Sequence, residues 1–474
     1  MLFPTIEFAL FFAVVFPLTW LLNDHNTAKK WFLVAASYFF YGYFYGISRG
    51  HFILILLASS VGNFVLALLL GRLPDGRSRL ALLWLGVILN LSVLAAFKYY
   101  NFFVAEGMNT LSSLGWSVRF PLFEVGLPIA ISFLTFHALS YIIDVYRRRL
   151  APTRSLVDIL LYISFFPHLI AGPIVRAKAF LEQTVHRSDV KDIRLGFAVF
   201  LIVGGLFKKV IIANYLATDF VEGVFRTPTE YSRLDLLLGM YAYALQIYCD
   251  FSAYTDIAIG VANLLGYQFP QNFNQPYRAL SVQDFWRRWH MTLSFWLRDY
   301  LYIPLGGNRH GKWRTYLNIL ITMGLGGLWH GANYTFVVWG FLHGFALVLE
   351  RMLGITGEGG HRRVPVAISW FVTFHFVCLT WVFFRAPSFD GAWAYLTTLV
   401  SGDAIWSTTA TPLVAAVLVF GALTQIIPND WFERLELRYD RASLATKVAL
   451  PFVVIFLVCV ASPSGVPPFI YFQF

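Results

Sequence analysis

The chain has 474 residues, of which 58% are hydrophobic and only 13% are charged, with a formal net charge of +10. A soluble domain carries about 25% charged residues, so this chain lacks the charge needed to cover a surface exposed to water. The composition excludes an ordinary soluble protein and predicts an all-α polytopic membrane protein. In such a protein the net positive charge is explained by basic residues in the cytoplasmic loops, and no nucleic-acid partner is needed to explain it.

Apolar runs close to the roughly 20 residues that cross a bilayer recur along the chain. The first, 4–22, lacks the basic start and the cleavage site of a signal peptide, so we interpret it as a span. About 11–12 transmembrane helices are expected, and residues 1–474 are predicted to form one membrane domain because no linker or repeat divides them. The candidate spans are 4–22, 31–47, 52–71, 80–97, 126–146, 195–221, 235–265, 316–330, 334–350, 364–384, 412–427 and 448–461.

Two further apolar stretches are poorly formed as spans. Residues 156–174 contain Pro167, Gly172 and Pro173, and residues 285–303 contain several arginines. The basic loops follow the positive-inside rule, with the N-terminus outside, only if neither stretch crosses the membrane. Both are therefore predicted to be re-entrant or interfacial elements on the cytoplasmic side, and such elements imply a cavity open to the cytoplasm.

The second of these stretches combines aromatic and basic residues. At the helical period, Phe285, Trp289, Thr292 and Trp296 share one stripe, which predicts an interfacial helix with its aromatic face against lipid. A guanidinium group can form paired hydrogen bonds with phosphate oxygens, so one interpretation is that these arginines bind an anionic, phosphate-bearing donor. The other interpretation is that they only follow the positive-inside rule or bind lipid headgroups. The candidate donor-binding residues are Arg287, Arg288 and Arg298.

Several polar residues inside apolar segments are predicted to be structural or to line a cavity. Asp250 and Asp256 are six residues apart, about 240° on a helix, so they do not share a face and do not form an acid–base pair. Pairing with an arginine or helix capping is expected for each. His168, beside Pro167, is predicted to be structural. The cysteines show no disulfide or metal-site spacing; they are Cys249, Cys378 and Cys459.

The stretch GGLWHGANYTFVVWGFLHG, residues 326–344, places two histidines among apolar neighbours. Ionisable residues inside membrane segments are rare and usually functional. His330 lies beside Trp329 at a break predicted over 331–333, where Asn333 stands and where glycines give the helix room to open. His343 lies within a regular span and is predicted to be structural. His330 is therefore the candidate general base.

Four motifs in a fixed order resemble the membrane-bound O-acyltransferase family, in particular its bacterial alginate and cellulose O-acetyltransferase and teichoic-acid D-alanyl transfer branch. They are FFPHLIAGPIVR, QIYCDFSAYTDIAIG, FWRRWHMTLSFWLRDYLYIPLGGNR and GGLWHGANYTFVVWGFLHG. The motif-bearing core spans about 155–350, and the hydropathy pattern extends the resemblance over nearly the whole chain.

This resemblance implies helices around a central tunnel in the cell (inner) membrane. The family's essential histidine corresponds to His330 and its second histidine to His290. Some members pair the essential histidine with an upstream asparagine or aspartate, and no residue here is assigned that role. The implied donor is cytoplasmic acetyl-CoA, with no permanently bound cofactor and no metal. The implied acceptor is an alginate- or cellulose-like exopolysaccharide or an acetyl-accepting partner protein outside.

Two alternatives stay open at this point. Within the same family, the transferred group would be D-alanine or a longer acyl chain. In a different class, a transporter or flippase would use an intramembrane histidine to relay protons. Transporters often show inverted repeats, and the sequence shows none.

Overall fold

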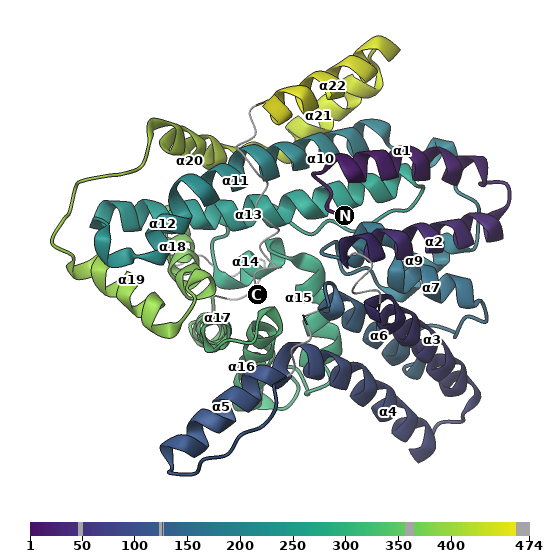
Figure 1. The fold of residues 1–474 in the computed structure, drawn as a ribbon, viewed down its shortest axis with the longest axis horizontal. Coiled ribbons are helices and arrows are strands. Elements are labelled where there is room, and N and C mark those ends of the chain that lie inside the picture. Colours follow the sequence, from purple (N-terminus) through teal and green to yellow (C-terminus); the bar gives the residue numbers. More distant parts are fainter. Residues whose placement is uncertain (46–50, 123–125, 127, 356–364, 461–474) are drawn as a thin grey trace. The chain divides into compact units, whose positions relative to one another are not determined.

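The computed structural model describes residues 1–45, 51–122, 126, 128–355 and 365–460 (Figure 1). The regular secondary structure of this described part is entirely helical and includes no strand, as the composition predicts. It divides into two compact units. The first unit comprises Met1–Arg194 and Val261–Pro270, and the second unit comprises Leu195–Gly260 and Gln271–Phe474. That the two units form one membrane domain stays a prediction.

The first unit holds nine α-helices among its described residues. A π-helical turn, η2 (Ala95–Tyr99), joins two of them into one continuous run. The helices are α1 (Ile6–Leu21), α2 (Asn26–Tyr45), α3 (His51–Arg72), α4 (Arg77–Leu94), α5 (Tyr100–Ser113), α6 (Ile131–Tyr146), α7 (Leu156–Ser164), α8 (Phe166–Leu169) and α9 (Ala177–Thr184).

The second unit follows with longer helices and three π-helical turns. The π turns are η4 (Lys208–Ala213), η5 (Ala217–Val221) and η8 (Arg298–Tyr302). The α-helices are α10 (Leu195–Phe207), α11 (Asn214–Leu216), α12 (Glu222–Arg226), α13 (Arg233–Leu264), α14 (Val282–Arg288), α15 (Met291–Leu297), α16 (Gly311–His330), α17 (Tyr334–Met352), α18 (Val366–Arg385), α19 (Phe389–Ser401), α20 (Pro412–Thr424), α21 (Asn429–Asp440) and α22 (Leu444–Val460). The last residues of α13 belong to the first unit.

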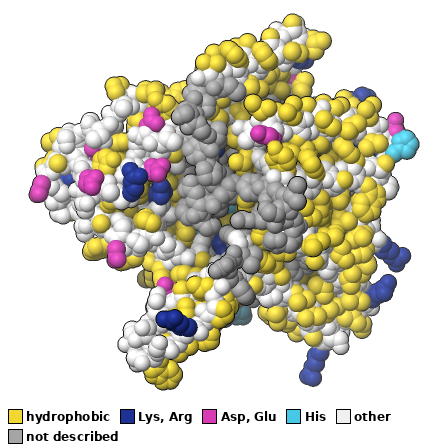
Figure 2. Space-filling view, in the orientation of Figure 1, with side chains coloured by type: hydrophobic (Ala, Val, Ile, Leu, Met, Phe, Trp, Pro, Cys, Tyr) yellow, Lys and Arg dark blue, Asp and Glu magenta, His cyan; other side chains and the backbone are white. Residues whose placement is uncertain are grey.

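Many of these helices suit a bilayer. By length and composition, five helical runs among the described residues can cross a membrane, and shorter apolar helices accompany them. Hydrophobic side chains cover much of the surface visible in Figure 2, where a water-soluble protein would present charge. The prediction of an all-α polytopic membrane protein is confirmed. The five runs are Phe52–Arg72, Arg77–Ser113, Leu195–Arg226, Tyr334–Met352 and Val366–Arg385.

Polar side chains join the helices of the first unit. Asn63 of α3 and Asn90 of α4 exchange two amide hydrogen bonds, of 3.0 and 2.9 Å. Such reciprocal bonds satisfy buried amides away from water. They fix how α3 and α4 pack.

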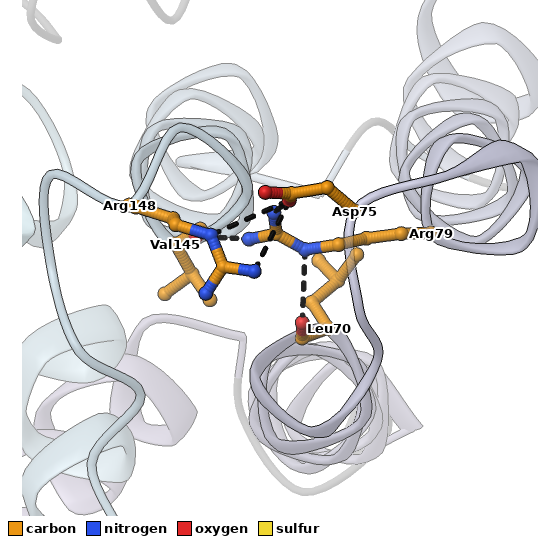
Figure 3. Close-up of polar contacts among 5 residues, drawn as sticks. All are labelled: Leu70, Asp75, Arg79, Val145 and Arg148. Carbon is orange, nitrogen blue, oxygen red and sulfur yellow. Dashed lines mark hydrogen bonds and ion pairs between the residues drawn. The ribbon is translucent and has the colours of Figure 1, made fainter.

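A buried arginine ties three helices at one end of the first unit (Figure 3). The guanidinium of Arg79, on α4, donates to the carbonyls of Leu70 at 3.1 Å and Val145 at 3.0 Å, near the ends of α3 and α6. It also pairs with Asp75, which accepts from Arg148 as well. From the sequence, this arginine is interpreted only as one of the basic loop residues of the positive-inside rule. The structure shows that it also caps two helices, because it donates to carbonyls near their C-terminal ends.

The stretch 156–174 is broken, as its prolines and glycines predict. It forms α7 and then the four-residue α8, with Pro167 in the first turn, where proline costs no hydrogen bond. The backbone N–H of Phe166 donates to Ser37 Oγ at 3.1 Å, which attaches α8 to α2. Its depth in the membrane stays a prediction.

In the second unit, α13 runs antiparallel to the segment Leu195–Arg226. A Cβ added to Gly260 would lie 2.8 Å from the carbonyl oxygen of Ala198, and one added to Gly205 would lie 2.9 Å from that of Ala253. Glycine therefore lets the two backbones approach closely. This contact holds the lysines of η4 beside α13.

Helices α16 and α17 form a tight hairpin. A Cβ added to Gly327 would lie 2.2 Å from the carbonyl oxygen of Phe336, and one added to Gly340 would lie 2.3 Å from that of Met323. The sequence predicts that the glycines around His330 give the helix room to open. At Gly327 and Gly340 the structure shows the opposite, because these two glycines let α16 and α17 pack closely, whereas Gly331 does end α16.

Candidate active site

His330 is the last residue of α16, at the break that the sequence predicts. Gly331 follows with an extended backbone (φ −166°, ψ 155°) and ends the helix. Asn333 then caps α17, because its Oδ1 accepts the backbone N–H of Thr335 at 3.0 Å. Its Nδ2 donates to the carbonyl of Pro387 at 2.9 Å. Asn333 therefore fixes the turn that carries His330.

The imidazole of His330 is enclosed by aromatic rings, and only 4% of the residue is exposed. Its ring centroid lies 4.9 Å from that of Trp329, 5.1 Å from Trp339 and 5.2 Å from Phe384. All three contacts are edge-to-face, the arrangement that aromatic rings prefer. The rings hold the imidazole in one orientation.

His290 lies at a sharp turn between α14 and α15. Its backbone is left-handed (φ 41°, ψ 54°), a conformation that few residues other than glycine adopt. The side chain is fully buried, and its Nδ1 lies 3.2 Å from Oδ1 of Asn272. Strained positions of this kind gather at functional sites, which adds weight to the interpretation of His290 as a site residue.

This turn corrects the prediction of one interfacial helix with an aromatic face against lipid. The stripe of Phe285, Trp289, Thr292 and Trp296 is buried within the protein. Trp289 packs against Trp381, with ring centroids 4.9 Å apart, and against Phe273 at 5.0 Å. The helical period does not continue past Trp289 and His290, where α14 ends, so one periodic face over the whole stretch does not exist.

The two predicted catalytic histidines both contact Trp329. The centroid of this indole lies 6.2 Å from that of His290 and 4.9 Å from that of His330. Residues from two separate sequence motifs therefore meet in one aromatic cluster of the second unit, which we call the histidine cluster (His290, Trp329 and His330).

His343 is occupied at both ring nitrogens. Its Nδ1 accepts the indole N–H of Trp286 at 3.2 Å, and its Nε2 lies 3.0 Å from Thr380 Oγ1. An imidazole with both nitrogens satisfied by the protein connects α17 to α14 and α18. Its geometry is that of a structural residue.

A carboxylate near the end of α17 also holds α14. Glu350 accepts hydrogen bonds from the backbone N–H groups of Val282 and Gln283, the latter at 3.0 Å. A negative charge at a helix N-terminus is favourable because the free amides and the helix dipole point at it. Glu350 and His343 together anchor the helix that leads to His290. Glu350 belongs to none of the four sequence motifs, so the sequence does not indicate this role.

The candidate donor-binding arginines differ in their surroundings. Arg287 is exposed. Arg288 pairs with Asp284 at 2.9 Å, and Arg298 pairs with its neighbour Asp299 at 2.7 Å. Arg298 is exposed as well, and Arg288 is half-buried.

Asp250 and Asp256 each pair with a lysine, where the sequence predicts an arginine or a helix cap. Lys209 Nζ lies 2.7 Å from Asp250 Oδ1, and both side chains are nearly buried. Lys208 pairs with Asp256 and also donates to Ser252 Oγ at 3.0 Å. Two successive lysines of η4 therefore meet two carboxylates of α13 that do not share a face.

His168 belongs to the first unit and is fully buried. Its Nε2 lies 2.9 Å from the carbonyl oxygen of Tyr162, and its ring stacks on His137 with centroids 4.5 Å apart. The bond fixes Nε2 as the protonated nitrogen, because a carbonyl only accepts.

Nothing in the described part of the chain resembles a metal site of three or more His, Cys, Asp or Glu residues. Cys249 and Cys378 are buried free thiols, and the side chain of Cys459 lies outside the described residues.

Asn272 is the site residue that the sequence pattern indicates least. It lies in the irregular stretch 271–275, where periodicity carries no information. Its only signal is its place shortly before the motif that contains His290. The contact between the two side chains appears only once the chain folds back at that turn.

Comparison with known proteins places these residues in a family. A model of the membrane-bound O-acyltransferase family matches residues 82–386. The chain is 42% identical to a probable alginate O-acetylase AlgI of Pseudomonas aeruginosa, over 83% of this chain and 74% of that protein. It is 38% identical to the probable alginate O-acetylase AlgI of Azotobacter vinelandii, over 93% and 94% of the two chains. It is 39% identical to a peptidoglycan O-acetyltransferase of Helicobacter pylori, over 77% and 72%.

Proposed function

This chain belongs to the membrane-bound O-acyltransferase family, and from that premise we propose that it moves an acetyl group from cytoplasmic acetyl-CoA to a hydroxyl of an exported polysaccharide. The observation that carries the proposal is the histidine cluster, in which His290 and His330 both contact Trp329. The relatives named for alginate and for peptidoglycan both act on glycan polymers, which supports a polysaccharide acceptor. Transfer is direct or passes through an acetyl-accepting partner protein outside.

His330 is the proposed general base. A hydroxyl is a weak nucleophile at neutral pH and needs a base as it attacks. His330 takes the hydroxyl proton while the oxygen bonds to the thioester carbonyl carbon. The carbon–sulfur bond then breaks, and the departing thiolate recovers the proton from the imidazolium. Backbone N–H groups at the turn 331–333 are the proposed donors to the oxyanion.

The donor is proposed to enter from the cytoplasm, with the N-terminus of the chain outside the cell (inner) membrane. Exposed Arg287 binds a phosphate of acetyl-CoA, and Arg288 and Arg298 contribute charge beside it. The central tunnel implied by the family resemblance would lead the acetyl group to the acceptor.

Thioester turnover by the purified protein tests this proposal. Detergent-solubilised protein is incubated with acetyl-CoA labelled in the acetyl group, and separately with palmitoyl-CoA and a D-alanyl thioester. Transfer or hydrolysis of the acetyl group at the highest kcat/KM supports the proposal. A preference for either other donor would reassign the transferred group, and absence of turnover with all three would contradict the proposed activity.

A further inference from the structure

The bond between Asn272 and His290 determines which ring nitrogen of His290 carries the proton. Asn272 Oδ1 lies 3.2 Å from the backbone nitrogen of Thr292 and 2.9 Å from its Oγ1. A backbone N–H only donates, so this amide atom is the oxygen and accepts. The same oxygen faces His290 Nδ1 at 3.2 Å, and Nδ1 must therefore be protonated.

A neutral imidazole with a proton on Nδ1 leaves Nε2 as a pure acceptor. His290 is fully buried, and Nε2 has no hydrogen-bond partner among the described residues. Buried polar atoms normally find a partner. His343 provides the contrast, because the protein satisfies both of its ring nitrogens.

We propose that Asn272 is a positioning residue that holds His290 in the Nδ1–H form, so that Nε2 accepts a hydrogen bond from a bound substrate beside His330. The proposal rests on the proposed function. Two substrate groups have the required chemistry: an amide N–H of the pantetheine arm of the acyl donor, and the acceptor hydroxyl.

The side chain of Asn272 can be replaced while the backbone hydrogen bonds that hold the turn at His290 remain. The backbone N–H of Met291 donates to the carbonyl of Asn272 at 2.9 Å, and that of Asn274 donates to the carbonyl of Arg288 at 2.9 Å. These bonds do not involve the amide side chain. An aspartate at position 272 would accept every donor that Oδ1 now accepts, whereas leucine would accept none.

The experiment compares Asn272→Leu, Asn272→Asp and a control, Thr292→Val, which removes the hydroxyl donor to the same oxygen and keeps the backbone N–H donor. Outer partners of functional histidines are worth about 10–100-fold. Asn272→Leu should lose about 100-fold in kcat/KM with a melting temperature like that of Thr292→Val, and Asn272→Asp should recover most of the loss. A loss expressed in KM for acetyl-CoA during hydrolysis identifies the donor amide. A loss confined to transfer identifies the acceptor hydroxyl.

Nuclear magnetic resonance of ¹⁵N-histidine-labelled protein tests the protonation state of His290 directly, without a measurement of activity. The signal that disappears in His290→Phe should report a protonated Nδ1 and an unprotonated Nε2, and Asn272→Leu should change that pattern. Full activity in Asn272→Leu, equal losses in Asn272→Leu and Asn272→Asp, or a protonated Nε2 would each overturn the proposal. Failure of wild-type acetyl turnover with the expected resonance pattern would instead contradict the proposed function.

Discussion

Helices α16 and α17 cross at Gly327 and Gly340, where a Cβ added to either residue would lie 3.1 Å from the Cα of the other. This contact brings the end of α16, and with it His330, against α17. In membranes, close packing of this kind replaces the hydrophobic effect as a source of helix association. The position of the proposed base therefore depends on the absence of two side chains.

Replacing Gly327 with alanine should separate the two helices. The added methyl would overlap the carbonyl oxygen of Phe336 at 2.2 Å, and overpacking costs about 1–3 kcal/mol. We expect a lower melting temperature and lower acetyl transfer. Gly204→Ala, in α10, is the matched control, because a Cβ there meets nothing within 4 Å. Equal melting temperatures for the two variants would show that the helices can move apart at no cost.

The ion pair between Lys209 and Asp250 should be sensitive to loss of one partner only. Breaking a buried pair leaves an uncompensated charge and costs about 3–5 kcal/mol. Lys209→Met should therefore lower the melting temperature strongly, and the double variant Lys209→Met/Asp250→Leu should recover most of the loss. A double variant as unstable as the sum of the single ones would mean that the two residues are not coupled.

Arg79 should stabilise the first unit through the carbonyls that it caps. Arg79→Met leaves the carbonyls of Leu70 and Val145 without this donor (Figure 3), and an unsatisfied buried group costs about 1–3 kcal/mol. Thermal unfolding in detergent measures the loss. Arg77→Met is a control of the same charge change near the start of the same helix, and a similar fall in both variants would refute the capping role.

The same contact predicts a pH dependence. The hydrogen bond from Arg148 and the charge of Arg79 hold the pKa of Asp75 below its usual value. A carboxyl with a lowered folded-state pKa stabilises the fold above its unfolded pKa, near 4, and this contribution is lost as the pH falls through the folded-state pKa. Asp75→Asn should therefore remove part of the acid sensitivity below about pH 4 and leave the dependence of the melting temperature on pH between about 5 and 8 the same as in the wild type. A slope within that range that differs between the two proteins would contradict the assignment.

Binding of acetyl-CoA should depend on Arg287. Arg287→Gln is expected to raise KM for acetyl-CoA about tenfold with little change in kcat, because a lost phosphate contact affects binding in the ground state and transition state alike. Arg309→Gln, in the basic loop before α16, is the control. An unchanged KM in Arg287→Gln would remove it from the donor site.

The long helices could be predicted because their apolar patterns are local. The span expected at 334–350 is observed as Tyr334–Met352, and the break expected at 331–333 separates α16 from α17. The end of α16 before Gly331 and the cap of α17 by Asn333 also depend only on residues that are neighbours in the sequence.

The contacts that define the histidine cluster could not be predicted in this way. The left-handed turn at His290 is stabilised by Asn272, which precedes it in an irregular segment. The aromatic stripe faces Trp381 because α14 is anchored by Glu350 and His343. Each of these depends on residues brought together by tertiary folding, which no periodicity reports.

His330 is proposed to be the base for acetyl transfer, and the activity of His330→Ala is the decisive measurement. Acetyl transfer from labelled acetyl-CoA is measured for the purified wild type, His330→Ala and the control Cys249→Ala, which removes a buried thiol. Each protein is first shown to elute as the same monodisperse species. We expect His330→Ala to lose at least about 100-fold in transfer rate, the lower limit for a general base, and Cys249→Ala to retain transfer. Wild-type rates in His330→Ala would contradict this role.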